Sequence, residues 1–467
     1  MQNSPRLTLF ACSAATLLVL VAFTLPLTVL APIVRNLHAS SSDRTWMLSA
    51  MSLGLAALLL ASGTVADDIG RRRVFLGGGA VFIVASAAAA LARDPVVFIL
   101  GRGAQGLGGA ALLASSLALL AEQFRGGEAR THATGIWGAM FGAGVAIGPT
   151  AGALLASAGS WRLAYWGLTG ASLLATAFAA TVLPESRAER RRRLDLPGLV
   201  LLSAGLVAVV AALVRGNPDG WTSRGVLALF ALGAALLGGF VTVARIRDDA
   251  LIDLDLFRRP TFVAALGGSL CLGLSVLALF SYLPGLLQDA LHTTALTAAL
   301  ALLPWSLVSV LVAWRARTIG RLLAPRMTLA MGMVLCAAGE LAMLGLRRED
   351  SWRHLLAGLL IAGVGTGLLN AGLARASVAV VPLARSGMGA GANNTARYLG
   401  AAIGVAIVAA IVQAQPPTPA GAAHGFDLAA VVCAAFCAAG AFIALRLVRQ
   451  VDFARAELDA GPDLART

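Results

Sequence analysis

The sequence of 467 residues contains no lysine and few charged residues of any kind. Charged side chains make up 13% of the chain and hydrophobic ones 58%, whereas a soluble protein of this length needs far more charge to cover its surface. All 36 basic residues are arginine, which we attribute to the codon usage of a GC-rich genome. The composition excludes an ordinary soluble globular protein and indicates an integral membrane protein.

The residues that several kinds of chemistry require are also missing. The five cysteines lie in apolar segments with no histidine or carboxylate pattern beside them, and the glycine-rich stretch 363–367 has no phosphate-binding lysine. We therefore expect no metal, no cofactor and no enzymatic activity. The net charge of +13 is scattered over short loops, so we expect no nucleic-acid partner either.

About fourteen apolar runs follow one another along the chain, most of them roughly 18 to 25 residues long, the length of a membrane-spanning helix. None of them alternates polar and apolar residues as the strands of a membrane barrel do. The sequence therefore predicts an all-α membrane protein with about fourteen transmembrane helices. The first expected span covers 8–34, the ninth 262–287 and the eleventh 327–346.

Two long arginine-rich segments, 184–195 and 245–260, bracket two of these runs. They predict an N-terminal six-helix bundle (1–185), a two-helix insert with flanking loops (186–250), a C-terminal six-helix bundle (251–450) and a tail (451–467). Repeated halves are usual in secondary transporters. If the N-terminus is cytoplasmic, the inner loops hold more than twice as many arginines as the outer loops, so we expect both termini in the cytoplasm.

The loop after the second run reads GTVADDIGRRR and carries the first strong motif. It resembles the signature loop of the major facilitator superfamily, and the matching residues are Gly63, Asp67, Gly70, Arg71 and Arg72. The glycines permit a tight turn, and Asp67 is expected to cap a helix N-terminus and to pair with an arginine across the gate between the halves. The alternative is a plain topological anchor. A weaker copy, Gly320-Arg321, follows in the second half.

The fourth run contains GRGAQGLGGA, which is similar to the superfamily's arginine motif through Arg102 and Gln105. An arginine this deep in a bilayer costs several kcal/mol unless it faces a cavity or a partner. The resemblance implies that Arg102 takes part in proton transfer. The alternative is that its side chain snorkels to the outer interface.

The fifth run contains GAGVAIGPTAG, which resembles the motif of drug–proton antiporters through Gly144, Gly148, Pro149 and Gly152. The three glycines share one helix face, so a neighbouring helix can approach closely, and Pro149 can kink the span. The alternative is ordinary packing of small residues. The resemblance extends over nearly the whole chain, and with the two-helix insert it favours the fourteen-span drug–proton antiporter family, which comprises multidrug efflux transporters.

The acid that this resemblance implies in the first span is missing, because Phe23 stands where the family usually has an aspartate and Thr28 stands in place of its asparagine. Glu340, in the eleventh run, is the only acid well inside any run. It is expected either to bind protons or cargo, or to lie at the interface and pair with Arg347, Arg348 or Arg353. Glu122, at the inner end of the fourth run, is a more exposed second choice for proton coupling.

The resemblance implies a secondary active efflux transporter that exports amphipathic drugs or secondary metabolites by alternating access, with protons as possible coupling ions. The rival hypotheses are a proton-independent facilitator or importer of the same fold, and a non-transporting membrane scaffold. We expect a monomer in the lipid bilayer of the bacterial inner membrane. The missing first-span acid weakens the case for a cationic cargo and leaves a neutral or anionic cargo open, so the sequence does not fix the charge of the cargo. The residues expected at a central cavity between the halves are Phe23, Thr28, Arg102, Gln105, Trp137, Phe141, Asn370 and Asn394, with Glu340 as a further coupling candidate.

Overall fold

A computed structural model of the chain describes residues 4–124, 127–187, 195–247, 250–315, 323–346, 351–381 and 386–449. Within these ranges the regular structure is entirely helical, as predicted. Gly320, Arg321, Arg347, Arg348 and the tail 451–467 lie outside the described residues, and so does the weaker copy of the signature loop.

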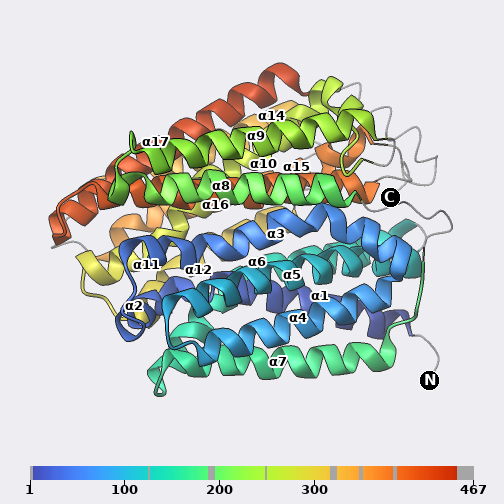
Figure 1. Cartoon of the computed structure of the whole chain (residues 1–467), viewed down its shortest axis with the longest axis horizontal. Coiled ribbons are helices and arrows are strands. Elements are labelled where there is room, and N and C mark those ends of the chain that lie inside the picture. Colours follow the sequence, from blue (N-terminus) through green and yellow to red (C-terminus); the bar gives the residue numbers. More distant parts are fainter. Residues whose placement is uncertain are drawn as a thin grey trace.

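The first seven helices form an N-terminal group, in which α1 packs against α5, α6 and α7, and α4 lies between α5 and α7 (Figure 1). The first expected span comprises α1 and α2, which are separated only by Leu25, before Pro26, and the Leu25 backbone itself keeps helical angles of −52° and −45°. The bounds are α1 Pro5–Thr24, α2 Pro26–Asn36, α3 Ser41–Ile69, α4 Arg71–Leu91, α5 Pro95–Gln123, α6 Gly127–Ser157 and α7 Trp161–Val182.

The remaining helices form a pair, α8 and α9, and a C-terminal group, α10 to α17. The expected ninth span contains a π-helical turn, η2, between α10 and α11. The bounds are α8 Leu196–Asp219, α9 Arg224–Ile246, η1 Leu254–Arg258, α10 Pro260–Leu272, η2 Gly273–Leu277, α11 Ala278–Ala290, α12 Ala295–Trp314, α14 Pro325–Leu341, η3 Trp352–Leu355, α15 Leu356–Ala379, α16 Ser386–Gln413 and α17 Pro419–Leu447.

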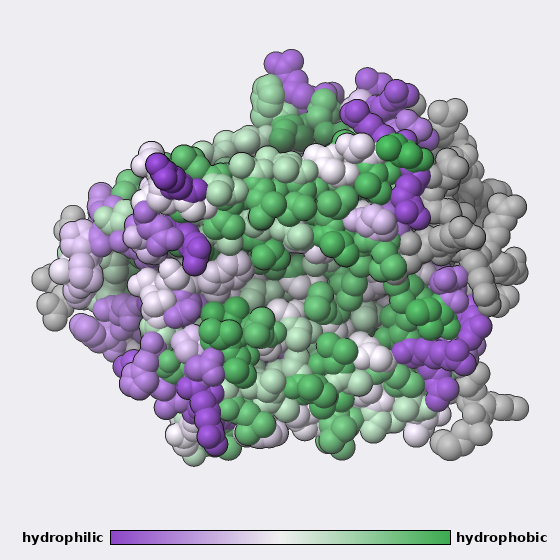
Figure 2. Space-filling view, viewed as in Figure 1, coloured by the Kyte–Doolittle hydropathy of each residue, from purple (hydrophilic) through white to green (hydrophobic). Residues whose placement is uncertain are grey.

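Thirteen helical segments in the described ranges are long and apolar enough to cross a membrane. The remaining expected span, 327–346, corresponds to α14, which is 17 residues long and packs against α15 and α17. A broad apolar belt covers the middle of the visible face, and polar residues gather at its two ends (Figure 2). This surface is what a protein embedded in a bilayer requires, and the predicted all-α membrane fold is confirmed.

One end of the bundle is marked by side-chain caps, and we call it the capped end. A hydroxyl or carboxylate oxygen there accepts a hydrogen bond from a backbone amide in the first turn of α3, α5, α7, α9, α12 and α17. Such caps satisfy amides that have no partner within the helix. The capping residues are Ser40, Asp94, Ser160, Ser223, Thr294 and Thr418.

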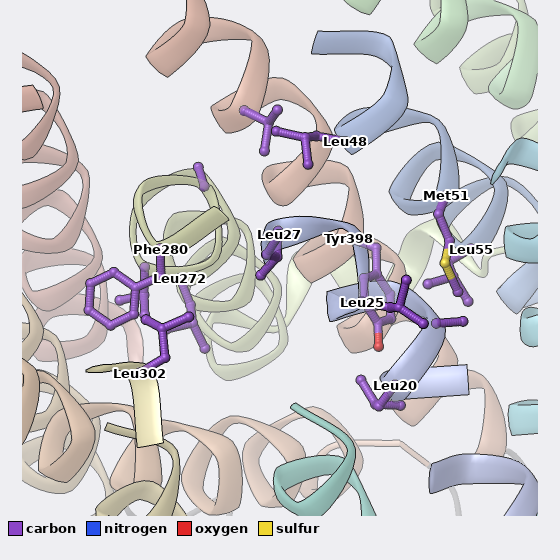
Figure 3. Close-up of a cluster of buried hydrophobic side chains, with 14 of the residues drawn as sticks. Leu20, Leu25, Leu27, Leu48, Met51, Leu55, Leu272, Phe280, Leu302 and Tyr398 are labelled. Atoms are coloured by element: carbon purple, nitrogen blue, oxygen red, sulfur yellow. The ribbon is translucent and has the colours of Figure 1, made fainter. Parts of the chain in front are cut away.

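The two groups meet along seams, where α3 lies against α16, α6 against α12 and α2 against α11. The buried core crosses these seams, because leucines of α1, α2 and α3 belong to the same cluster as Leu272, Phe280, Leu302 and Tyr398 (Figure 3). A second cluster joins Leu202 and Leu206 of α8 to Leu60 of α3 and Ala402 of α16. The helix α8 therefore contacts both groups at once.

Candidate functional site

The signature loop is a sharp junction between α3 and α4 that is held by ion pairs. Gly70 separates the helices with a φ of 126°, a conformation that favours glycine. The guanidinium of Arg71 contacts Asp67 Oδ1 at 3.0 Å and Glu122 Oε2 at 2.5 Å. Arg72 donates a hydrogen bond to the Ala180 carbonyl. These contacts tie together the ends of α3, α4, α5 and α7.

The expected partners of Asp67 were wrong. Asp67 lies in the last turn of α3 rather than at a helix N-cap, and the residue before α4 is Gly70. Its ion-pair partner, Arg71, belongs to the same group of helices and not to the facing half. The physical reason is proximity along the chain, because the turn at Gly70 places Arg71, the first residue of α4, beside the last turn of α3.

A cavity of about 290 Å³ opens beside this cluster. It is lined by residues from the end of α5 and from the chain that follows α7, namely Leu119, Glu122, Gln123, Pro184, Glu185 and Ser186. Glu122 therefore both binds Arg71 and faces open space. Its carboxylate is engaged in an ion pair with Arg71.

Arg102 is fully buried in the middle of the N-terminal group. Its three guanidinium nitrogens donate to five acceptor atoms, of which the closest are the Ala22 carbonyl at 2.7 Å and Gln105 Oε1 at 2.9 Å. The others are the carbonyls of Met47 and Phe23 and the sulfur of Met51. Snorkelling to the interface is excluded, because the charge is satisfied by the backbone of α1 and α3.

Gln105 continues this network into α4. Its Nε2 donates to Ser86 Oγ at 2.9 Å, and Ser86 Oγ donates to the Phe82 carbonyl at 2.7 Å. Both side chains are buried. Arg102 and Gln105 thus lie together inside the N-terminal group and not at the expected cavity between the halves, in a polar chain that links α1, α3, α4 and α5.

The glycines of α6 face α1 at very short range. A Cβ atom at Gly148 would lie 2.8 Å from the Val21 carbonyl oxygen, and one at Gly152 would lie 2.9 Å from that of Leu25. At Gly144 the nearest backbone atom would be the Leu17 carbonyl oxygen at 2.8 Å. Real Cβ atoms are not found so close, so these positions require glycine and allow the two backbones to touch.

Thr28 and Phe23, which were expected to line a cavity, instead contact other helices directly. Thr28 Oγ1 donates a hydrogen bond to the Pro149 carbonyl of α6 at 2.9 Å. The Phe23 ring contacts the Tyr398 ring, with centroids 5.7 Å apart. Thr28 therefore joins α2 to α6, while Phe23 lies where α1 meets α16 of the other group.

The arrangement has known counterparts. The family model of the Major Facilitator Superfamily matches residues 12–405. The chain belongs to this superfamily. Two solved structures share the fold. The human organic anion transporter MFSD10 has a TM-score of 0.64 and 18% identity, and the match covers 95% of this chain and 100% of that one. A bacterial homologue of the human lysosomal transporter Spinster, in an inward-facing conformation, has a TM-score of 0.68 and 14% identity, and the match covers 98% of this chain and 99% of that one.

Curated relatives of this superfamily member come from actinobacteria. Multidrug resistance protein Stp of Mycobacterium tuberculosis is 30% identical, over 89% of this chain and 77% of that protein. Puromycin resistance protein pur8 of Streptomyces alboniger is 33% identical, with 89% and 86% covered. Multidrug efflux pump LfrA of Mycolicibacterium smegmatis is 30% identical, with 94% and 87% covered.

Glu340 lies deep inside the C-terminal group of helices. It is fully buried, and neither carboxylate oxygen has a hydrogen-bond partner among the described residues. Its polar neighbours are Ser275 and Cys437, whose side chains lie 2.9 Å apart. Glu340 faces inward from α14 and is not at the interface, and Arg353, one of its expected partners, is exposed at the end of the bundle. The other two expected partners, Arg347 and Arg348, lie outside the described residues.

The aromatic and amide residues expected at the cavity are only partly brought together. Trp137 and Phe141 form an edge-to-face pair with centroids 4.9 Å apart, and the indole nitrogen of Trp137 is buried without a partner. Asn370 and Asn394 are partly buried. The neighbouring Asn393 joins α16 to α10, because its Oδ1 accepts a hydrogen bond from Ser269 of α10.

Arg397 was not selected as a site residue from the sequence. Its Nε atom is buried and has no hydrogen-bond partner. The signal was available, because Arg397 lies 11 residues beyond Ser386, well inside an expected span, as Arg102 does in the fourth.

Proposed function

We propose that the chain is a secondary active transporter that exports small amphipathic molecules from the cytoplasm by alternating access. The observation that carries this proposal is the similarity over most of the chain to proteins named for multidrug efflux and antibiotic resistance. The two groups of helices would act as the rocking halves, with boundaries near residues 185 and 250, and α8 and α9 as the insert. The protein would work as a monomer in the inner membrane, with the capped end outside.

The contacts at the capped end support a gate that can open. Arg44 of α3 and Asp289 of α11 form an ion pair at 3.4 Å, and both side chains are partly exposed. Gln288 of α11 donates to the Thr28 carbonyl at 3.3 Å, and Gln413 of α16 donates to Thr45 Oγ1 at 3.2 Å. Exposed polar contacts of this kind are each worth only about 1 kcal/mol or less, so a conformational change can break them.

Coupling to protons is a separate part of the proposal. An exporter driven by protons needs a group that binds a proton in one conformation and releases it in the other. Glu340 is the candidate, because it is buried without a hydrogen-bond partner and lies near the π-turn η2, a local irregularity that is frequent at functional sites.

Transport into inside-out vesicles tests the proposed function. We expect vesicles that contain the protein to accumulate a fluorescent drug when an inward-acidic proton gradient is imposed, and not without it. Uptake that follows the concentration gradient alone would support a facilitator, and the absence of any transport across a drug panel would support a scaffold. Arg102→Ala vesicles, with matched protein content, serve as the inactive control.

A further inference from the structure

We propose that the cargo of this transporter is an organic anion whose negative group pairs with Arg397 of α16. The inference rests on the proposed export function and assigns the chemical class of its substrate. It follows from the position of Arg397, from the absence of a protein partner for its charge in the described residues, and from the aromatic rings beside it.

Arg397 lies near the middle of the bilayer. It follows the first residue of α16 by 11 positions, which is roughly 16 Å along the helix axis and about half of a hydrocarbon core of ~30 Å. The helix is fixed at this level by direct backbone contact with the ninth span, because a Cβ atom at Gly273 would lie 2.7 Å from the Ala401 amide nitrogen. The contact fixes the backbone of α16 at this level, and the Arg397 side chain is partly buried there.

The charge of Arg397 has no counter-ion in the part of the chain that the structure describes. None of the ion pairs there includes it, and its Nε is buried without an acceptor. Glu340, the acid inside the spans, is itself unpartnered. An uncompensated cation at this depth is costly, so it is expected to meet a negative group when the protein works.

Arg102 shows what a structural arginine looks like in the same molecule. All three of its nitrogens have acceptors, most of them backbone carbonyls, and its charge is spread over α1, α3 and α5. Arg397 has none of this support. The contrast assigns Arg102 to holding the N-terminal group together and leaves Arg397 available to a ligand.

The surroundings of Arg397 add a second requirement for the ligand. The ring of the next residue, Tyr398, contacts the ring of Phe23, which belongs to α1 in the N-terminal group, so the two rings meet across the boundary between the two groups. Tyr398 lies between leucines of α1 and α2 in the close-up view (Figure 3). When the seam opens during transport, a flat apolar body would meet these two rings, while a carboxylate, sulfonate or phenolate would accept bidentate hydrogen bonds from the guanidinium.

Matched pairs of anionic and neutral aromatic compounds test the assignment. The purified protein in lipid nanodiscs is studied by equilibrium dialysis, with empty nanodiscs subtracted. The pairs are naphthylacetate with naphthylacetamide, and anilinonaphthalene sulfonate with phenylnaphthylamine. We expect the anion of each pair to bind wild type at least about tenfold more tightly, Arg397→Gln to lose that preference, and Arg397→Lys to retain part of it. Arg353→Gln, at an exposed arginine, should behave as wild type.

Several results would overturn the proposal. They are equal binding within each pair, a preference for the neutral compounds, no binding of either anion, or an anion preference that survives in a folded Arg397→Gln variant. Size-exclusion profiles of both Arg397 variants show whether they fold. Transport separates this inference from the proposed function: gradient-driven export of neutral drugs without anion preference removes only the anion site, whereas anion binding with no export of any compound removes only the export function.

Discussion

Arg71 binds two carboxylates at once, one on α3 and one on α5, and its side chain is largely buried. An arginine in this position fixes the relative position of three helix ends. It will contribute more than the usual exposed ion pair, because both of its partners lose a charge-assisted hydrogen bond if it is removed.

We expect Arg71→Ala and Asp67→Asn to reach the membrane in normal amounts but to reduce transport by about tenfold. Each variant removes a contact worth about 1–3 kcal/mol, which is enough to change the balance between two conformations. Vesicle transport and immunoblotting measure the two quantities. Arg73→Ala is the control, because the Arg73 side chain is 63% exposed and its ion pair with Glu185 spans 3.5 Å. Normal transport by both variants would reduce the loop to a topological anchor.

Glu340 allows a second prediction at this scale. If its carboxyl group carries the coupling proton, Glu340→Gln should still fold, because glutamine has nearly the same volume, but should lose proton release on addition of cargo. Proton release is followed with a pH dye in lightly buffered detergent. Glu122→Gln should retain the signal, since Glu122 is held by Arg71. Undiminished release from Glu340→Gln would move the coupling group elsewhere, to the cargo itself for example.

How far the sequence could identify individual residues depended on what surrounds them. Charge and depth were enough to select Arg102 and Glu340, since both properties follow from position in an apolar run. Their partners could not be found, because Arg102 is satisfied by carbonyls of α1 and α3, and carbonyls carry no sequence signal. Asn394 was chosen although Asn393 makes the buried hydrogen bond, because one residue along a helix is a turn of about 100°.

At the scale of elements, the glycine face of α6 is the clearest case in which packing decides function. Because the backbone of α6 lies directly against α1, any movement of one relative to the other occurs at these glycines. The contact also buries Thr24, whose hydroxyl donates to the Gly144 carbonyl at 3.3 Å.

We expect Gly148→Val to lower the free energy of unfolding by about 1–3 kcal/mol and to abolish transport, because the added methyl groups would overlap the backbone at Val21. Thermal unfolding in detergent and vesicle uptake are the measurements. Gly138→Val on the same helix is the matched control, since a Cβ atom there would meet nothing within 4 Å. Equal stability of the two variants would show that α1 and α6 are less closely packed than the structure indicates.

The sequence predicted the existence of the spans better than their internal irregularities. The run 8–34 was predicted as one regular span, but its ladder of hydrogen bonds is interrupted near Leu25, because Pro26 cannot donate a hydrogen bond to the preceding turn. The π-turn in the ninth span gave no signal, because it inserts a single extra residue into an unbroken apolar run. Such departures depend on neighbouring helices rather than on local composition.

At the scale of the whole molecule, the distribution of arginines between the loops predicts the orientation in the membrane, with both termini in the cytoplasm. We expect a cytoplasmic reporter fused at Thr467 to be active and one inserted in the loop 414–426 to be inactive, with the opposite result for a reporter that works only outside. Activity of the external reporter at Thr467 would contradict the topology and, with it, the direction of transport. A fusion at Gly220, between α8 and α9, is a third point that should agree with the loop 414–426.

The position of α8 determines by which route a molecule dissolved in the bilayer could reach the space between the halves. This helix lies over the seam between α3 and α16, and α9 covers it in turn, with leucines such as Leu227 and Leu232 exposed on its far side. In the part of the chain that the structure describes, neither α8 nor α9 packs extensively against the seam between α6 and α12. Cargo dissolved in the bilayer would then enter laterally through the seam between α6 and α12. The helices α8 and α9 would block lateral entry through the seam between α3 and α16.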